Sequence, residues 1–175
     1  MIFTFRFITD EEESFIMDIN INHDQTFEQL HDAIQEKLDY DPAQLASFFI
    51  SNESWEKLQE ITLLDMGVEG GKNMADSRIE DFFTAKNQHL LYEYDYLAGR
   101  LFFGNVIRTI DAASPIDLPS VSKLEGSIPP QIKRFDVNLN DEDWGNDEDE
   151  DEYGDFEDEL PEDLEDYNIH EDNSI

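Results

Sequence analysis

The sequence contains no cysteine and few basic residues, and each shortage excludes a class of chemistry. Without cysteine the chain has no disulfide framework, no thiol nucleophile and no thiolate ligand for zinc or an iron–sulfur cluster. Its 11 Lys and Arg residues stand against 44 Asp and Glu residues, for a formal net charge of −33. Because binding to nucleic acid or anionic lipid depends on cations that neutralise phosphates, we expect no direct nucleic acid binding and no membrane binding.

Long apolar runs are also missing. No stretch of the sequence approaches the ~18 apolar residues that a membrane span needs. The first ten residues lack the basic segment and continuous apolar segment of a secretory signal. The sequence therefore predicts a cytoplasmic protein.

The acidic excess is divided unevenly along the 175 residues. Residues 1–135 hold 24 acidic and all 11 basic residues, which leaves −13, whereas residues 136–175 hold 20 acidic residues and no Lys or Arg. Like-charge repulsion and sparse apolar content predict that residues 136–175 form a largely disordered, low-complexity tail behind a folded domain over 1–135. The isolated apolar residues of this tail are candidate anchors on a partner: Trp144, Tyr153, Phe156, Leu160, Leu164 and Tyr167.

The first 40 residues show two kinds of apolar periodicity. Residues Ile2–Thr9 and Phe15–Ile21 alternate apolar and polar side chains, which predicts an antiparallel hairpin with one buried face. Thr26 and Gln29 then form a capping box before apolar residues at helical spacing. This pattern, in Phe27, Leu30, Ile34 and Leu38, predicts the main helix, which Asp41-Pro42 ends.

The remaining folded part is predicted to contain four more strands and one more helix. A second capping-box pattern, Ser77 with Glu80, predicts a short helix to about Thr84. Four prolines between positions 115 and 130 predict an irregular, extended segment that packs Ile116, Leu118 and Ile132 on the domain. We therefore expect an α+β fold with a mostly antiparallel sheet, one main helix on a face, a second short helix and a disordered acidic C-terminal tail. The four further strands are expected over 47–51, 55–61, 90–96 and 100–110.

No motif in the sequence indicates catalysis, a cofactor or a metal. The Gly71-Lys72 pair does not belong to a P-loop, because Met66 and Asn73 occupy the positions of its first Gly and its Ser or Thr. Two near-matches to calcium loops in the tail lack the closing Glu, and the four histidines have no ligand spacing. Carboxylates are too numerous for an acid–base pair to be chosen. We therefore assign no catalytic, cofactor-binding or metal residues.

A stripe of tyrosines is the most distinctive pattern in the folded part. Alternation predicts that Tyr92, Tyr94 and Tyr96 share one face of a strand, either as core residues or as a binding surface. His31, beside an apolar helix residue, either borders a cleft or is structural. The candidate binding surface comprises His31, Tyr92, Tyr94, Asp95, Tyr96 and Arg100.

Three of these segments occur together in a known family. The helix sequence that ends in Leu30-His31, the strand Tyr94-Asp95-Tyr96 and the segment Gly126–Pro130 appear in the same order as in the plasmid pRi ORF-3-like proteins. Over about residues 1–135 the chain resembles this family, some of whose members are passenger proteins of an insertion element with a resolvase-like name. The resemblance implies a compact α+β domain and no established activity. Resolvase chemistry does not follow from it, because an activated serine among arginines and a basic DNA-binding region are missing.

Three functions remain open at this point. The first is a non-catalytic interaction protein whose acidic tail docks on a basic surface of a protein partner. The second is a small ligand-binding or enzymatic domain with a cleft where His31, Tyr94 and Asp95 converge. The third is a nucleic-acid mimic that occupies a DNA-binding protein, with an affinity that disappears at high salt.

Overall fold

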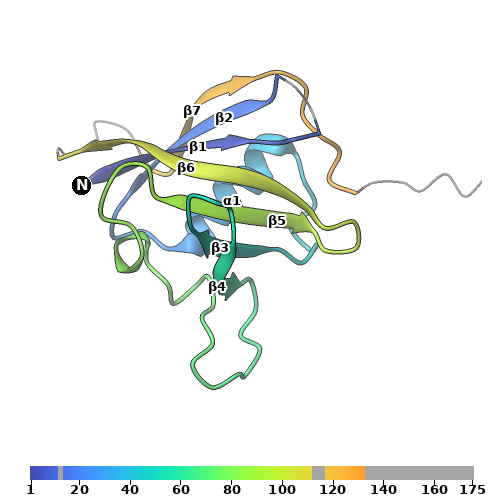
Figure 1. The fold of residues 1–175 in the computed structure, drawn as a ribbon. Helices are drawn as coiled ribbons and strands as arrows, with labels where there is room; N and C mark the ends of the chain where they lie inside the picture. Colours follow the sequence, from blue (N-terminus) through green and yellow to red (C-terminus); the bar gives the residue numbers. More distant parts are fainter. Residues whose placement is uncertain (12–13, 112–116, 133–175) are drawn as a thin grey trace, which may run out of the picture. The chain divides into compact units, whose positions relative to one another are not determined.

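A single antiparallel sheet dominates the computed structural model, which describes residues 1–11, 14–111 and 117–132 (Figure 1). These residues contain seven strands in the order β4-β3-β5-β6-β1-β2-β7, with every neighbouring pair antiparallel. Within the same ranges no helix is long and apolar enough to cross a membrane. The elements are β1 (Ile2–Ile8), β2 (Ile16–Asn22), α1 (Phe27–Leu38), β3 (Ser47–Ser51), β4 (Lys57–Thr62), β5 (His89–Asp95), β6 (Arg100–Ile110) and β7 (Ser120–Glu125).

The β1–β2 hairpin forms as its alternation predicts. Its register runs from Ile2 opposite Asn22 to Ile8 opposite Ile16. One face of the hairpin lies in the core through Phe3, Phe5, Phe7, Met17, Ile19 and Ile21. On the other face polar side chains bond to each other, as in the two hydrogen bonds from Arg6 to the Asp18 carboxylate. Period-two alternation therefore separates core from surface on these strands.

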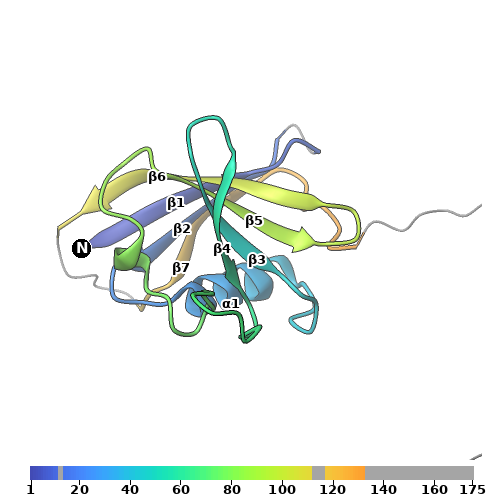
Figure 2. The same cartoon turned by 60° about the horizontal axis from the view of Figure 1, so that its bottom comes forward.

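Helix α1 lies against the inner side of the curved sheet (Figure 2). Its capping box is present, because the Thr26 hydroxyl accepts from the Gln29 N–H and the Gln29 side chain accepts from the Thr26 N–H. The helix ends at Asp39, whose φ of 55° is in the left-handed region. Its buried face contributes Phe27, Leu30, Ile34 and Leu38 to the core.

The prediction of an α+β fold with two helices was wrong. The described residues form a mostly antiparallel sheet with one α-helix, and the expected second helix is a single 3-10 turn, Ile79–Asp81. The turn ends at Phe82, whose φ of −125° departs from helical geometry. The capping contact at its start, from the Arg78 N–H to the Asp81 carboxylate at 3.0 Å, lies one residue later than the Ser77–Glu80 pattern.

The prediction of an irregular segment after Asp111 was also wrong in part. Strand β7 pairs with β2 from Ser120 opposite Asn20 to Glu125 opposite Ile16, and it lies at the edge of the sheet. No proline falls within its six residues, so the ladder is free to form between Pro119 and Gly126. Ile132, expected to pack on the domain, is 49% exposed.

Candidate functional site

His31 and Tyr92 form a buried polar pair beneath the sheet. The Gln35 amide donates to the Tyr92 oxygen at 2.6 Å, so the Tyr92 hydroxyl donates to His31 Nδ1 at 2.8 Å. Burial raises the pKa of Tyr92 and lowers that of His31, which keeps both side chains neutral. His31 is therefore a hydrogen-bond acceptor within the core, and it does not line the hollow that contains Tyr94 and Asp95.

Residues 126–132, here called the strap, are bonded to Tyr40, Asp41 and Arg100. The Tyr40 hydroxyl donates to the Pro129 carbonyl at 2.5 Å, and an Arg100 guanidinium nitrogen donates to the Pro130 carbonyl at 2.5 Å. The Gln131 side chain accepts from the Asp41 N–H at 2.7 Å. The strap belongs to no strand, so its carbonyls have no ladder partners. Side chains satisfy them instead: Tyr40, which follows α1, and Arg100 of β6.

Arg100 is used for an internal ion pair. Its Nε lies 2.6 Å from the Glu11 carboxylate, its guanidinium lies 5.2 Å from the centre of the Tyr94 ring, and its side chain is buried. Although burial alone lowers it, the hydrogen bond to Glu11 and nearby charges raise the pKa of Arg100 overall. The scarce cation therefore holds the strap and the ring in place.

The tyrosine stripe divides at a register shift between Glu93 and Asp95. Tyr92 and Tyr94 face the core, where the Tyr94 ring stacks 4.5 Å from Phe102. Tyr96 follows the shift and contacts Ser47 and Glu60 through its hydroxyl, on the other face of the sheet. The predicted shared face therefore holds for two of the three tyrosines.

The Tyr94 hydroxyl is buried and has no hydrogen-bond partner among the described residues. Burial raises the pKa of this phenol, so it stays protonated. A buried unpaired hydroxyl is a cost to the fold, and its persistence indicates that packing of the ring decides its position.

A hollow of about 250 Å³ opens where β5 turns into β6. Asp95 lies in its wall, only 7% exposed, and its carboxylate accepts from the Leu97 and Ala98 N–H groups. Leu97 is 92% exposed, and three other exposed apolar side chains share this rim. We call this feature the Leu97 hollow; it is lined by Ala43, Gln44, Leu45, Tyr94, Asp95, Tyr96, Leu97 and Ile132.

The lining of the Leu97 hollow suits apolar contact. Its large exposed apolar members are Leu45, Tyr96, Leu97 and Ile132, and Asp95 is its single acidic residue. No group of three or more metal-binding side chains exists among the described residues. The hollow therefore offers an apolar surface with one negative charge, and it lacks the paired groups of acid–base or nucleophilic chemistry.

Comparison with known families identifies the chain. The sequence profile described as plasmid pRiA4b ORF-3-like protein matches residues 8–171. The chain belongs to this family. The match continues beyond residue 135, where the resemblance seen in the sequence was expected to end.

A solved structure has a similar fold to this plasmid pRiA4b ORF-3-like protein. It is described as the crystal structure of a protein of unknown function, MM3350, from Methanosarcina mazei Go1. The two chains share 18% identity with a TM-score of 0.62, over 74% of this chain and 71% of the other. No protein of curated function matches the chain. At this identity the likeness concerns the fold alone.

The structure separates the candidate residues of this family member into two groups. His31, Tyr92 and Arg100 are internal, whereas Tyr94, Asp95 and Tyr96 line the Leu97 hollow. The sequence interpretation missed Leu45, Leu97 and Ile132; an exposed leucine in the turn between two strands was the available signal. The six tail anchors, from Trp144 to Tyr167, lie outside the described residues.

Proposed function

We propose that this plasmid pRiA4b ORF-3-like protein is a non-catalytic interaction protein that docks on a basic protein partner. The Leu97 hollow is the contact of the folded part, and the acidic tail supplies long-range attraction. One observation carries the proposal: four large apolar side chains, between 45% and 92% exposed, surround one hollow in a chain of net charge −33.

Exposed apolar side chains gathered at one place favour a docking role. Single exposed leucines are common on protein surfaces, whereas contiguous apolar patches with a polar rim mark interaction sites. A partner that covers the Leu97 hollow would remove apolar area from water, at roughly 25 cal/mol per Å² before the costs of association. The hollow is therefore suited to a small apolar anchor of the partner.

The charge of the chain supports a basic partner. Asp95 lines the hollow, residues 1–135 carry a net charge of −13, and residues 136–175 add 20 acidic residues with no Lys or Arg. Charges of one sign speed the encounter with a partner of opposite sign and repel acidic surfaces. The folded surface and the tail thus select the same class of partner.

The internal use of the polar residues argues against catalysis. His31 accepts from Tyr92 inside the core, and Arg100 is bonded to Glu11 and to the strap. Neither side chain is placed to act on a bound substrate in the Leu97 hollow. This arrangement favours the interaction role over the enzymatic alternative.

Affinity capture tests the proposed function. The full chain, a form ending at Phe135 and the Leu97→Ser variant are compared at about 0.05 M and about 0.3 M salt. We expect a basic protein to be captured by the full chain, to be lost with Leu97→Ser and to be weakened by removal of the tail or by added salt.

The matched control is Ile8→Ser, which also removes an exposed aliphatic side chain but from β1. Circular dichroism spectra establish that every form is folded. An unchanged set of captured proteins in both the Leu97→Ser variant and the shortened form would overturn the proposal.

A further inference from the structure

We propose that the free edge of β4 is a strand-addition site for an extended segment of the partner in which basic and apolar residues alternate. This inference rests on the proposed function, because it names where the chain of the basic partner lies. Strand addition supplies backbone hydrogen bonds along the edge and places alternate side chains on the two faces of the sheet.

The open edge follows from the backbone bonds of β4. In an antiparallel pair, successive residues direct their N–H and C=O groups alternately toward and away from the neighbouring strand. The Leu63 N–H donates to the Ala46 carbonyl across the β3–β4 pair at 3.2 Å, so residues 59 and 61 face β3 and residues 60 and 62 face outward.

Thr62 agrees with this assignment. Its N–H donates to the Lys72 carbonyl at 3.0 Å, and its own carbonyl accepts from the Met74 N–H at 2.8 Å, both outside the sheet. The backbone groups of Glu60 also point outward, and no backbone partner lies opposite them among the described residues. The edge is therefore covered at Thr62 and open at Glu60.

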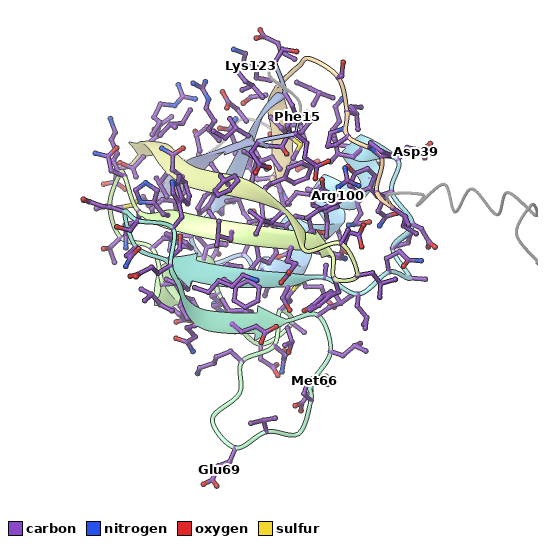
Figure 3. The ribbon with its side chains drawn as sticks, turned by 45° about the vertical axis from the view of Figure 1, so that its right-hand side comes forward. Phe15, Asp39, Met66, Glu69, Arg100 and Lys123 are labelled. Atoms are coloured by element: carbon purple, nitrogen blue, oxygen red, sulfur yellow. The ribbon has the colours of Figure 1, made fainter. Side chains whose placement is uncertain are left out.

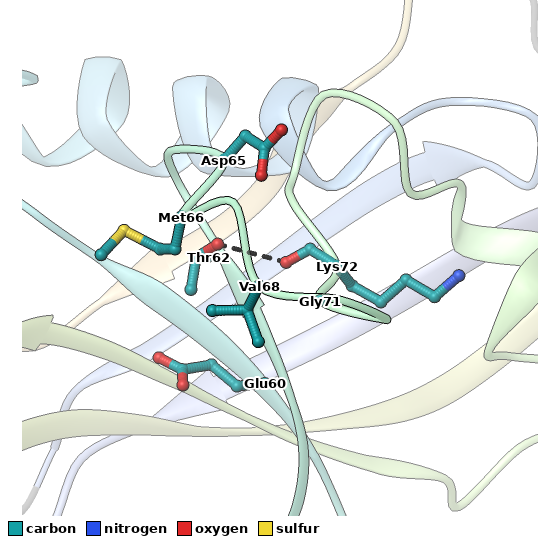
Figure 4. Close-up of a pocket in the computed structure, with 7 residues that line it drawn as sticks. All are labelled: Glu60, Thr62, Asp65, Met66, Val68, Gly71 and Lys72. Atoms are coloured by element: carbon teal, nitrogen blue, oxygen red, sulfur yellow. Dashed lines mark hydrogen bonds between the residues drawn. The ribbon is translucent and has the colours of Figure 1, made fainter. Parts of the chain in front are cut away.

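A hollow of about 270 Å³ lies next to this open position (Figure 4). Glu60 and Thr62 form its strand side, and Met66 and Val68 form its apolar side. Met66 and Glu69 lie on the long loop after β4, which extends away from the sheet (Figure 3). A residue added opposite Glu60 would therefore place its backbone on the edge and an apolar side chain against Met66 and Val68.

Apolar side chains are exposed all along this edge. Leu58 projects from β4 itself, and the loop that follows contributes three more. Natural edge strands are usually blunted by charge, bulges or cover. Here the pairing with β3 shifts register between Lys57 and Gln59 and cover is present at Thr62, which leaves the open position at Glu60 between them. The one cation of β4 is engaged, because Lys57 Nζ lies 2.8 Å from the Glu93 carboxylate. The four side chains, between 56% and 68% exposed, are Leu58, Leu64, Met66 and Val68.

Charge complementarity decides the occupant. Glu60 and Asp65 line the hollow against the single lining cation Lys72, and Glu69 is exposed on the same loop as Asp65. An acidic strand placed here would meet like charges, which argues against this chain's own tail and against a second copy. A strand with alternate Lys or Arg and apolar residues satisfies both the carboxylates and the apolar side chains.

One hydrogen bond between side chains links the linings of the two hollows. Glu60 lines the hollow beside β4, and its carboxylate accepts from the hydroxyl of Tyr96, which lines the Leu97 hollow, at 3.2 Å. A partner seated on the β4 edge therefore lies beside the surface assigned to its folded contact.

The test uses the full chain and a synthetic peptide, acetyl-Lys-Val-Arg-Val-Lys-Val-Arg-amide, at about 0.15 M salt. We expect binding by calorimetry and slowed hydrogen exchange of the Glu60 amide when the peptide is present. The same peptide with every backbone nitrogen methylated keeps its charges and side chains, and we expect it to bind about tenfold more weakly or worse.

Two variants at Glu60 test the same backbone hydrogen bond from the side of the protein. Glu60→Pro removes the outward N–H without removing a bond to β3, and Glu60→Ala keeps the N–H while removing the carboxylate. We expect Glu60→Pro to bind the peptide about tenfold more weakly than Glu60→Ala. The methylated peptide keeps the inference falsifiable if the proline variant does not fold.

The outcomes separate this inference from the proposed function. Equal binding of the plain and methylated peptides, with no protection of the Glu60 amide, overturns strand addition while charge-driven docking stands. Self-association of the full chain through this edge, abolished by Glu60→Pro, also overturns it, because a second copy is then the occupant. No binding of either peptide overturns strand addition, and the capture experiment decides the proposed function independently.

Discussion

At the scale of single residues, Gly126 fixes where the strap begins. Its φ of 85° is in the left-handed region, and an added Cβ would fall against the carbonyl oxygen of Ser14. The atoms that the Cβ would meet belong to the backbone of Ser14 and Phe15, so they cannot rotate away as a side chain would. We expect Gly126→Ala to lower the free energy of unfolding by about 2–3 kcal/mol, measured by urea unfolding.

Gly99 provides the control for Gly126. It also has a positive φ, of 64°, but an added Cβ there meets open space. Gly99→Ala should therefore cost only about 1 kcal/mol, from backbone conformation alone. Equal losses in the two variants would contradict the steric role of Gly126.

His31 gives the fold a sensitivity to mildly acidic pH. Burial lowers the pKa of its imidazole, against a smaller opposing effect of Asp32. An unfolded histidine titrates near ~6.5, so below that pH the unfolded chain binds a proton that the folded chain refuses. We expect the free energy of unfolding to fall from pH 7 to pH 5, and to fall less in His31→Gln, as measured by urea unfolding at each pH. The same decline in both proteins would exclude His31 as its source.

At the scale of elements, α1 depends on its capping box. Thr26→Ala removes the acceptor for the Gln29 N–H, and we expect a loss of about 1 kcal/mol in the free energy of unfolding. Thermal and urea unfolding measure this loss. The exposed neighbour Glu28→Ala is the control, and a loss as large as that of Thr26→Ala would show that the cap is not the cause.

The strap depends on Arg100 in a similar way. Arg100→Met keeps an apolar stem but removes the bonds to Glu11 and to the Pro130 carbonyl. We expect a loss of about 2 kcal/mol in stability and faster hydrogen exchange in residues 126–132, because Glu11 is left partly buried without its partner. Lys86→Met, at an exposed position, is the control. Unchanged exchange in the strap would contradict the anchoring role of Arg100.

Elements with a strong local pattern could be predicted from the sequence. The alternation of β1 and β2 and the capping box of α1 each coincide with their tertiary environment, so local and global preferences agree. The segment after Ser77 shows the opposite case, because its capping-box pattern is followed by a single 3-10 turn that ends at Phe82. Strand β7 was not predicted, because the prolines on both sides of it indicate irregular structure over the whole segment. These prolines do not prevent strand formation in the six residues that lie between them.

The candidate site could be predicted only in part, for a similar reason. Tyr92 and Tyr94 follow strict alternation, whereas the register shift after Glu93 moves Tyr96 to the other face. A shift of this kind depends on the pairing of β5 with β6, which no single strand's sequence reveals. The rim of the Leu97 hollow joins residues from three separate segments, so its assembly also required the fold.

At the scale of the whole molecule, charge and exposed apolar surface have complementary roles. The net charge of −33 favours encounter with basic partners at a distance, and it opposes association of two copies. In the proposed function the Leu97 hollow and the edge of β4 are the short-range contacts, and the Tyr96 hydroxyl donates to the Glu60 carboxylate between their linings. Residues that the family resemblance brought to attention, such as His31 and the prolines of the strap, mainly hold this surface in shape.

Site-specific photo-crosslinking tests the central claim most directly. A photoreactive phenylalanine analogue replaces Leu97 in the full chain, and in a control it replaces Ile8, an exposed aliphatic residue of β1. The proposed docking surface predicts a discrete adduct with a basic protein from position 97 and none from position 8. No adduct from position 97, or the same adducts from both positions, would contradict the assignment of the Leu97 hollow as the partner-binding surface.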